Sequence, residues 1–503
     1  MGKLLLAFLV LTLTLAKSQD CSVIEKPGFG LLKRVFGVPA VVALGEPQTY
    51  YATYVSGLGK KTVASQQNDK WIEHEFGSIK INGSKRWPMQ TFTFRNKLYM
   101  LYGEYRKRDK LNVFFAYELN QQTLNPVGEP KKLYEFAYES KMEIFAAFNT
   151  VQISPAGANA LVFWFATPQQ KGGTTLHFFY CNQHLEPVKS PVYELGASRE
   201  IRQTIMTPSG SLYFLVLERS IDNGTAVGSP FKLLKIGIDG NVKTEPVGLF
   251  DKNMEDAKLL VNKNEELTIA GYCSGDDEPY ASSVFNAVVD TASLEINHVK
   301  VASLNLVNMS EKTNGTAYFL KDVVYDASGN LFVLGEEYER KVAYHEDSNG
   351  ETSESVTFIY GDVLVSCIPA NTFEVKTKWV MKQQRTSPSE TPFASYCVKP
   401  CNKGISLIMN ALVEGTFTVD RNKITNRELS STVTKMVSLD VDLEKNERLF
   451  LCGMQERAKE NYTHGYSCHA QLLISNCQFM PDGSVILFSK TGSASDYFLY
   501  VWR

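Results

Sequence analysis

The sequence predicts an all-β fold made of repeated antiparallel units, and three observations support this prediction. First, the apolar runs are short, rich in β-branched and aromatic residues, and bounded by Gly, Asn, Asp or Ser. Second, the chain after its N-terminus lacks a long amphipathic helical pattern. Third, a similar strand–turn–strand pattern recurs at a loose interval of roughly 50–65 residues, which indicates stacked β-sheet repeats.

Each repeat contains a small polar turn followed by an apolar strand. Asn96-Lys97 precedes Leu98–Tyr102, for example, and Ser328-Gly329-Asn330 precedes Leu331–Gly335. The apolar strands of the eight units begin at Tyr50, Leu98, Ala160, Leu212, Leu267, Leu331, Ile405 and Val485. A third strand follows, as in Leu111–Leu119, and then a turn and a polar fourth strand.

These units predict a single closed β-propeller of eight blades, each with four antiparallel strands; seven blades is the alternative. A lone four-stranded sheet cannot bury both of its faces, whereas radial stacking buries them and leaves only short edges. The last unit ends at its third strand, Tyr497–Trp502, so we expect a segment near Ile24–Val38 to supply the fourth strand and close the ring. Two or more β-sandwich domains are the competing architecture, which fits the strand content but not the recurring unit.

The longest polar interruption runs from residue 346 to residue 354, between two strands of the sixth unit. No Pro/Ser-rich linker divides the chain, so we interpret this interruption as a hairpin insertion. The expected organisation is therefore one propeller domain over residues 19–503.

The N-terminus predicts secretion. Lys3 supplies a positive charge, Leu4–Leu15 form an apolar and hydroxyl run, and Ala16-Lys17-Ser18 offers small residues for cleavage. We therefore expect residues 1–18 to be a signal peptide and the mature protein to be extracellular; an N-terminal membrane anchor is the alternative. No later apolar stretch approaches 18 residues, so stable membrane insertion is not expected.

Nine cysteines fit a secreted protein in which some thiols pair. They are Cys21, Cys181, Cys273, Cys367, Cys397, Cys401, Cys452, Cys468 and Cys477. Local candidates for disulfides are Cys397 with Cys401, and Cys452 with Cys468 or Cys477. Five sequons predict a glycoprotein; their acceptors are Asn82, Asn223, Asn308, Asn314 and Asn461.

The charge distribution argues against a nucleic-acid partner. The 52 basic and 54 acidic residues are interspersed and give a net charge of −2. The longest basic cluster, Arg106–Arg108 with Lys110, is interpreted as a solvated hairpin tip.

Residues 256–385 carry motifs that resemble a family of uncharacterised secreted β-propeller proteins common in Bacteroidetes. These motifs are Leu267–Tyr272, Asp326–Leu331, Gly335–Tyr338, Tyr360–Val365 and Trp379–Gln384. The resemblance implies a propeller in the cell envelope or medium. It brings no catalytic residues.

Most sequence signals of catalysis are lacking. The chain contains no G-x-S-x-G elbow, no H-E-x-x-H pattern, no P-loop and no EF-hand loop. Its seven histidines form no metal pair at i, i+2 or i, i+4. Asp276, Asp277 and Glu278 have the oxygen atoms to bind Ca²⁺, but we interpret them as a solvated acidic turn. No cofactor is expected.

A loose Gly-Glu-Tyr motif occurs in two units, as Gly103-Glu104-Tyr105 and as Gly335-Glu336-Glu337-Tyr338. Each motif is expected where a central strand ends, near the ligand face of a propeller. Loops that follow the second strands would form a recognition face. The candidate ligand-binding residues are Tyr105, Arg106, Arg108, Asp276, Asp277, Glu278, Glu337, Tyr338 and His345.

The sequence therefore favours a secreted, non-enzymatic β-propeller that binds an extracellular protein or glycan. An extracellular glycoside hydrolase or polysaccharide lyase on the same fold is the second hypothesis. It would need converging carboxylates, or a Tyr/His/Arg set, around the central channel. A coat or matrix component that cross-links through an odd cysteine is the third.

Overall fold

The structure is a computed structural model, which describes the following parts of the chain. The described residues are 24–25, 35–44, 49–56, 60–67, 70–81, 83–138, 152–156, 160–169, 173–196, 199–207, 209–218, 231–249, 253–262, 266–275, 282–304, 318–346, 352–372, 374–382, 384–386, 395–412, 432–450, 477–480, 483–490 and 497–502. All elements over these ranges are β-strands, which confirms the all-β prediction. The same ranges contain no helix that is long and apolar enough to cross a membrane.

The chain forms two compact units. The N-terminal unit comprises Gly28–Val301, and the C-terminal unit combines Met1–Pro27 with Ala302–Arg503. Each unit is described by itself below.

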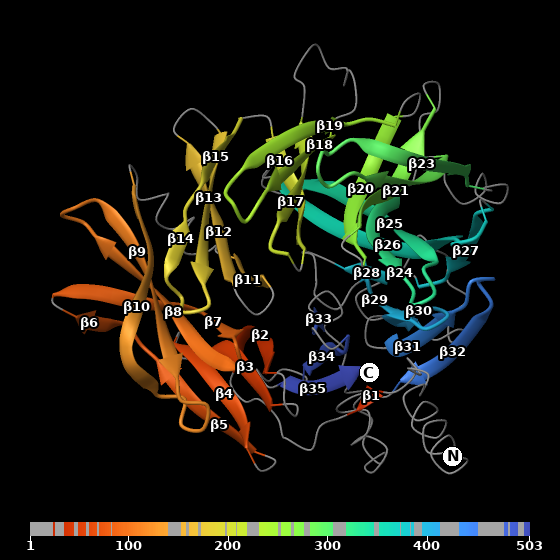
Figure 1. Ribbon diagram of the computed structural model, residues 1–503. Coiled ribbons are helices and arrows are strands. Elements are labelled where there is room, and N and C mark those ends of the chain that lie inside the picture. The colour runs from red at the N-terminus through yellow and green to blue at the C-terminus, as the bar shows by residue number, and fades with distance from the viewer. Residues whose placement is uncertain are drawn as a thin grey trace, which may run out of the picture. The chain divides into compact units, whose positions relative to one another are not determined.

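The N-terminal unit contains five antiparallel sheets that follow one another in chain order (Figure 1). The first sheet holds β2 (Val35–Leu44), β3 (Thr49–Ser56), β4 (Lys61–Gln67) and β5 (Lys70–Phe76). The second holds β6 (Ile79–Ile81), β7 (Ser84–Phe94), β8 (Lys97–Arg106), β9 (Leu111–Leu119) and β10 (Pro126–Ala137). The third holds β11 (Gln152–Ala156), β12 (Ala160–Gln169), β13 (Gly173–Asn182), β14 (Pro187–Lys189) and β15 (Val192–Leu195). The fourth holds β16 (Arg199–Met206), β17 (Leu212–Glu218), β18 (Phe231–Ile236) and β19 (Val242–Val247), and the fifth holds β20 (Asn253–Val261), β21 (Leu267–Ser274), β22 (Ser283–Val289) and β23 (Ile296–Ser303).

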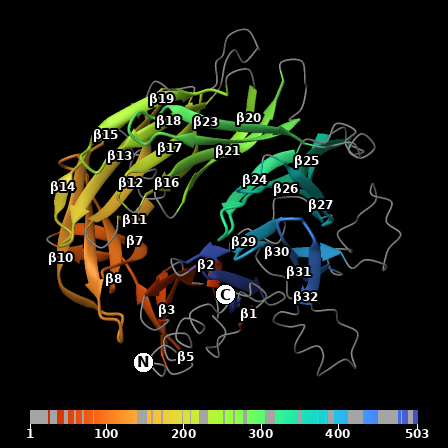
Figure 2. The same cartoon turned by 45° about the vertical axis from the view of Figure 1, so that its right-hand side comes forward.

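The C-terminal unit contains three further sheets (Figure 2). The sixth sheet holds β24 (Tyr318–Tyr325), β25 (Leu331–Glu346), β26 (Thr352–Ile368), β27 (Lys376–Val380) and β28 (Gln384–Thr386). The seventh holds β29 (Tyr396–Cys401), β30 (Gly404–Leu412), β31 (Thr432–Leu439) and β32 (Lys445–Phe450). The eighth holds β33 (Gln478–Phe479), β34 (Val485–Lys490), β35 (Tyr497–Trp502) and, from the other end of the chain, β1 (Ile24–Glu25).

Within each of the first seven sheets, strands pair in the order in which they occur along the chain, as in β16-β17-β18-β19. Only β15 and β28 leave this path, and they return to pair with β13 and β26. A β-sandwich would instead show Greek-key connections between two sheets. Repeated meander sheets are the organisation of propeller blades.

The eighth sheet joins the two ends of the chain. Ile24 pairs with Trp502, and Glu25 pairs with Val501, in an antiparallel register. This pairing confirms the expectation that an N-terminal segment completes the last sheet. The contribution is shorter than the expected Ile24–Val38, because Val35 already begins β2 in the first sheet.

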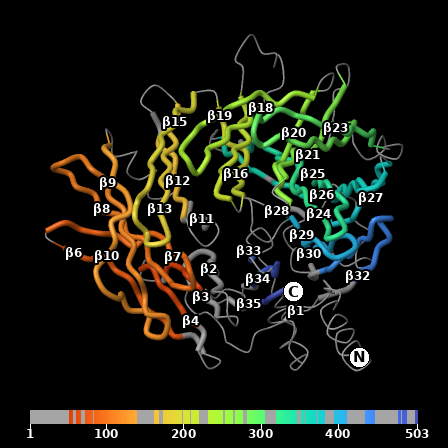
Figure 3. Tube along the Cα trace, in the orientation of Figure 1, coloured from red at the N-terminus to blue at the C-terminus, as the bar shows by residue number. Residues whose placement is uncertain are grey.

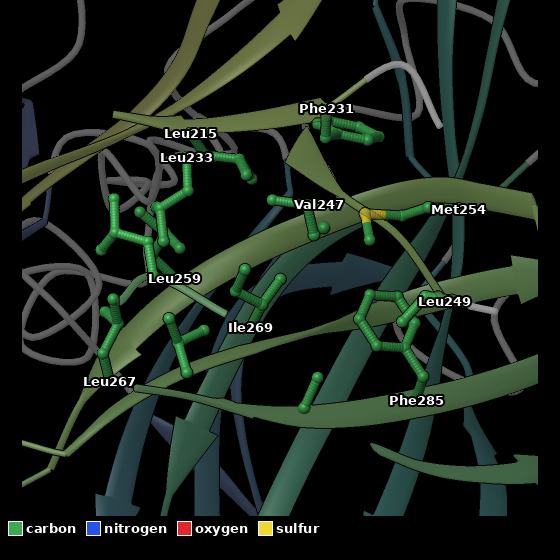
Figure 4. Close-up of a cluster of buried hydrophobic side chains, with 14 of the residues drawn as sticks. Leu215, Phe231, Leu233, Val247, Leu249, Met254, Leu259, Leu267, Ile269 and Phe285 are labelled. Atoms are coloured by element: carbon green, nitrogen blue, oxygen red, sulfur yellow. The ribbon is translucent and has the colours of Figure 1, made fainter. Parts of the chain in front are cut away.

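The second strands form the centre of the core. Every residue of β21 is buried, which is typical of a strand that is covered on both faces. Side chains of the fourth and fifth sheets of the N-terminal unit, including Leu215, Phe231, Leu259 and Ile269, pack into one cluster (Figure 4). Burying each such side chain contributes about 1.5–3 kcal/mol.

A β-bulge recurs in the strand that precedes the buried apolar strand of several sheets. The register shifts lie between Pro88 and Gln90 in β7, between Ile201 and Gln203 in β16, and between Leu320 and Asp322 in β24. Each shift lies opposite the buried part of the following strand, and the traces of β8 and β25 can be followed in Figure 3. Since a bulge bends its strand and re-aims side chains, the repetition gives equivalent strand ends similar geometry.

Candidate functional site

Three strands carry a glutamate that pairs with cations. Glu104 lies on β8, Glu218 ends β17 and Glu336 lies on β25. Arg86 of β7 is the cross-strand partner of Glu104, and Arg199 of β16 is the partner of Glu218. Glu104 and Glu218 therefore repeat one arrangement, whereas Glu336 lies opposite Phe319 and is paired with Lys382 and Lys321.

The carboxylate of Glu104 is buried and bonded on both oxygens. Arg86 Nε donates to Oε2 at 2.7 Å, and Arg106 Nε donates to Oε1 at 2.6 Å. Arg86 also donates to the Tyr117 hydroxyl at 2.7 Å, and its guanidinium lies 3.6 Å from the centroid of the Phe115 ring. Burial raises the pKa of Glu104, but the hydrogen bonds and charges of the two arginines outweigh burial and lower the pKa below its ordinary value.

Glu218 has a more exposed version of this arrangement. Arg199 Nε donates to Oε1 at 2.9 Å, and Lys232 lies 2.5 Å from Oε2. The hydrogen bond from Lys232 is the largest cause of the lowered pKa of Glu218, and Arg199 adds to it against a smaller effect of burial.

Glu336 lies in the most buried network of the C-terminal unit. Lys382 Nζ donates to Oε1, and the Ser395 hydroxyl donates to Oε2. Lys321, the bulge residue of β24, donates to the Ser395 hydroxyl and lies 3.9 Å from Oε2. Ser395 has a φ of 76°, which is unfavourable for a residue with a Cβ, and these two hydrogen bonds hold its side chain.

The side chain of Lys382 is fully buried. Burial lowers the pKa of its ammonium group, and attraction to Glu336 opposes this effect. The backbone N–H of Lys382 donates to Asp362 Oδ1 at 3.0 Å, and the ammonium lies 5.5 Å from the centroid of the Tyr360 ring. The lysine thus ties the end of β27 to β25 and β26.

Glu337, next along β25, is held by the backbone of β26. Its Oε2 accepts a hydrogen bond from the N–H of Asp362 at 3.0 Å. A Cβ atom at Gly361 would lie 2.3 Å from this same oxygen. The glycine of Tyr360-Gly361-Asp362 therefore makes room for the Glu337 side chain.

These carboxylates are poorly suited to acid–base catalysis. A glycosidase acid needs a raised pKa and a second carboxyl group about 5–9.5 Å away. Glu104 has a lowered pKa, and both oxygens of Glu104 and of Glu336 accept hydrogen bonds from cationic or hydroxyl groups. Their geometry is that of structural ion pairs.

A different feature of the sixth sheet reaches beyond these networks. Strands β25 and β26 continue past the first residue of β24 as a ribbon, whose cross-strand pairs run from Tyr338–Tyr360 to Glu346–Thr352. Strand β28 pairs with β26 at Phe358–Tyr360, and beyond these residues the ribbon is two-stranded. Figure 1 shows the two strands side by side. The polar interruption is therefore a hairpin, as predicted, but its strands are 16 and 17 residues long and extend well into the interruption.

One face of this ribbon is aromatic and apolar; we call it the ribbon face. Because side chains alternate along a strand, Tyr338, Arg340, Val342 and Tyr344 share this face with their cross-strand partners. Those partners are Tyr360, Phe358, Val356 and Glu354. The ring centroid of Tyr338 lies 5.2 Å from that of Tyr360 and 6.3 Å from that of Phe358.

Aromatic side chains are exposed at the distal end of the ribbon face and on the strand next to its proximal end. Tyr344 is 70% exposed at the distal end, and Phe319 of β24 is 51% exposed at the proximal end. Phe319 packs edge-on against Tyr338 at 5.5 Å between centroids. Arg340 pairs with Glu354 across the ribbon at 3.4 Å. The result is a stripe of aromatic and valine side chains, which we call the aromatic stripe, with the Arg340–Glu354 ion pair on the same face.

The candidate residues of the N-terminal unit lie close together along the chain but differ in environment. Tyr105 is half-buried and lies 4.8 Å from Tyr138 between ring centroids. Arg106 is engaged by Glu104, and Arg108 lies exposed in the turn between β8 and β9. Tyr105 and Arg106 belong to β8 itself, so the expected position in a loop is wrong for them.

The candidates of the C-terminal unit all lie on β25, because this strand runs on to Glu346 instead of ending near Tyr338 as expected. Glu337 binds the β26 backbone, and Tyr338 belongs to the ribbon face. His345 is exposed on the opposite face, where its Nε2 lies 2.9 Å from the Ser355 hydroxyl. The structure thus places one of these three residues in the aromatic stripe.

Other predicted residues lie outside the described residues. They are Asp276, Asp277 and Glu278, and the sequon asparagines Asn82, Asn223, Asn308, Asn314 and Asn461. Across the described ranges, no group of three or more His, Cys, Asp or Glu residues is arranged to hold a metal ion.

The expected bridge between Cys397 and Cys401 is wrong. Cys401 is disulfide-bonded, whereas Cys397 carries a free thiol. Both residues lie on the extended strand β29, where four residues span about 13 Å, well beyond the ~7 Å limit for the Cα atoms of a disulfide. Cys477 also carries a free thiol, which excludes its expected bridge to Cys452.

Sequence reasoning missed the partners of the two motif glutamates. Arg86, Lys382 and Ser395 are distant from Glu104 or Glu336 in sequence, and although Lys382 lies in the motif Trp379–Gln384, that motif does not indicate its partner. An uninterrupted hairpin register centred on Arg95-Asn96 would place Arg86 opposite Tyr105, and only the bulge between Pro88 and Gln90 moves it opposite Glu104. No local signal identifies Lys382 or Ser395 either.

Comparison with known proteins gives a resemblance of fold only. No family model matches the chain, and no curated protein matches it. Solved structures that resemble it include the WD40 domain of SCAP from fission yeast, at 9% identity over 95% of this chain and 97% of that chain, with a TM-score of 0.40. Puromycin hydrolase matches at 11% identity over 82% of this chain, which spans about half (52%) of that chain, with a TM-score of 0.36. The α-L-arabinanase of Penicillium chrysogenum matches at 12% identity over 66% and 96% of the two chains, with a TM-score of 0.29. We draw no conclusion about activity from these likenesses.

Proposed function

We propose that this chain is a secreted, non-enzymatic β-propeller that binds an extracellular protein through the ribbon face of β25 and β26. The observation that carries the proposal is the aromatic stripe from Phe319 to Tyr344. Its two ends are 51% and 70% exposed, on a strand pair that runs beyond the neighbouring β24.

The composition of the ribbon face favours a protein partner. Protein interfaces are enriched in Tyr, Phe and Arg at their centres and surround them with polar groups. The ribbon face combines Tyr344, Phe358 and Arg340 with a central pair of aliphatic residues, Val342 and Val356. A glycan site would instead place hydrogen-bonding side chains at its centre, next to flat aromatic platforms, to satisfy sugar hydroxyls.

A non-enzymatic role is supported by the state of the motif glutamates. Glu104 and Glu336 are engaged on both oxygens, so neither supplies a free acid or base. The alternative, a glycoside hydrolase or lyase, would need groups other than these.

The closed eight-bladed ring is part of the proposal. The eight meander sheets and the pairing of β1 with β35 support it, because an N-terminal strand in the last sheet is the expected device for sealing a propeller. A sealed ring would give the ribbon a rigid base.

Site-specific photo-crosslinking tests the proposed function. A photoreactive phenylalanine analogue replaces Tyr344 on the ribbon face in one variant and Ala343 on the opposite face in the matched control. After exposure to the extracellular fluid of the source organism, we expect a defined protein adduct from position 344 and none from position 343. Equal labelling from both positions would contradict the proposal.

A glycan array probed with wild-type protein and with Tyr344→Ser gives the second arm. We expect no glycan signal that depends on Tyr344. A signal that is lost in Tyr344→Ser would overturn the protein assignment in favour of a carbohydrate ligand.

A further inference from the structure

Two free cysteines lie in contact between the first strands of the seventh and eighth sheets, both within the C-terminal unit. Cys397 is the second residue of β29 and is buried, and Cys477 directly precedes β33 and is half-buried. The Cys477 side chain lies within hydrogen-bonding reach of the Cys397 thiol. They are 80 residues apart in the sequence, so the fold brings them together.

An independent contact shows that the same face of β29 packs against the eighth sheet. Lys399, two residues after Cys397 and therefore on the same side of the strand, is buried. Its ammonium group donates to the Trp502 carbonyl at 3.3 Å and lies 5.8 Å from the centroid of the Trp502 ring. This face of β29 is thus fixed against β35 next to the cysteine pair.

We propose that Cys397 and Cys477 form a disulfide that fastens the eighth sheet, with its N-terminal strand β1, to the seventh. That this disulfide forms in an oxidising compartment rests on the proposed secretion of the protein. The choice of Cys397 and Cys477 as partners depends only on the closeness of their side chains.

The oxidant we name is a small disulfide such as glutathione disulfide. The more accessible thiolate of Cys477 attacks one sulfur of the oxidant, forms a mixed disulfide and expels one glutathione thiolate. The Cys397 thiolate then attacks the Cys477 sulfur, forms the protein disulfide and expels the second glutathione thiolate. Two cysteine thiols lose two protons and two electrons, and one disulfide becomes two glutathione thiols.

Burial makes the second step the slower one. Burial, together with the hydrogen bond to Cys477, raises the pKa of the Cys397 thiol well above its ordinary value. The thiolate is the attacking species, so its small population delays ring closure. The proximity of the two side chains offsets the small thiolate population, because the attacking sulfur is already held near its target.

The experiment uses the purified, reduced full chain and glutathione disulfide, so its result does not depend on where the protein resides. After incubation, the chain is unfolded in denaturant with N-ethylmaleimide and mapped by mass spectrometry without reductant. We expect one peptide pair joined through Cys397 and Cys477, with both residues protected from alkylation. Cys181 and Cys367, which carry free buried thiols, should be alkylated and serve as internal controls.

Two outcomes would overturn the proposal. One is alkylation of both Cys397 and Cys477. The other is a Cys477–glutathione adduct that persists while Cys397 is alkylated. As a second measurement, after the same treatment with glutathione disulfide, the double variant Cys397→Ala/Cys477→Ala should melt several degrees below the oxidised wild type. Equal melting temperatures of the variant and the oxidised wild type would also contradict the proposal.

Discussion

Replacement of Glu104 by Gln tests whether the buried ion pair holds the end of β8 in place. Gln keeps the size of the side chain but removes its charge, and it presents an N–H₂ group to one of the two arginines. Arg86, whose side chain is 9% exposed, then lacks a counter-charge. We expect the substitution to lower the free energy of unfolding by about 3–5 kcal/mol, the usual cost of leaving a buried charge unpaired.

The magnitude depends mainly on Arg86. At an effective dielectric constant of 20, opposite charges about 4 Å apart attract by about 4 kcal/mol. Arg106 also contacts Glu104, but its side chain is 34% exposed, so solvent screens its share. Glu118→Gln is the matched control on β9: Glu118 pairs with Lys97 at 2.9 Å, but the two side chains are 34% and 54% exposed. Its loss should cost less than about 1 kcal/mol.

The pH dependence follows from the lowered pKa of Glu104. A carboxyl group with a depressed folded-state pKa stabilises the fold above its unfolded pKa, and this stabilisation is lost as the pH falls through the folded value. The advantage of wild type over Glu104→Gln should therefore be complete at neutral pH and shrink below the ordinary pKa of 4.5. Urea unfolding of wild type and Glu104→Gln between about pH 3 and 7, a range that spans the ordinary carboxyl pKa values, measures this difference in stability. Equal costs of Glu104→Gln and Glu118→Gln at pH 7 would refute the reasoning.

Three further predictions concern the fold. Gly404→Ala should lower the free energy of unfolding by about 1–3 kcal/mol or more in urea, because Gly404 has a φ of 109° and a Cβ would lie 2.0 Å from the Leu439 carbonyl oxygen. Gly483, the control, has a φ of 79° and open space around a Cβ, so Gly483→Ala should cost clearly less. Equal costs would contradict the geometry. Deletion of residues 22–27 removes β1 and leaves the edge of β35 unpaired, so the melting temperature should fall and aggregation should rise in light scattering; unchanged values would speak against the pairing of Ile24 with Trp502. Lys382→Met should lower the urea midpoint, because it leaves Glu336 without its closest cation. The double variant Lys382→Met/Glu336→Gln should recover part of this loss. A double variant whose loss of stability equals the sum of the two single losses would exclude coupling between the residues.

The strands were predictable because their signals are local. Leu111–Leu119 and Tyr497–Trp502 match β9 and β35 residue for residue, since each is a compact apolar run bounded by turn residues. The supply of a strand by the N-terminus was also predictable, because the last unit visibly lacked its fourth strand. Its length was not, since no local signal separates Ile24–Glu25 from the following residues.

The site was less predictable because its contacts are long-range. The polar residues Glu336–Glu346 suggested the end of a strand, yet β25 continues through them as one side of a ribbon whose two faces differ. Lysine is usually a surface residue, but Lys382 is buried, and its ammonium group lies against Glu336 and the Tyr360 ring. Burial of this kind depends on which strands meet in space, and residue type alone does not encode it.

A crystal structure of the secreted full chain tests the central claim most directly. We expect eight sheets of four or five strands arranged radially around one axis, with Ile24 and Glu25 paired to β35 and the ribbon face open to solvent. Separate groups of sheets that each close on themselves, or an N-terminal segment paired elsewhere, would contradict the account.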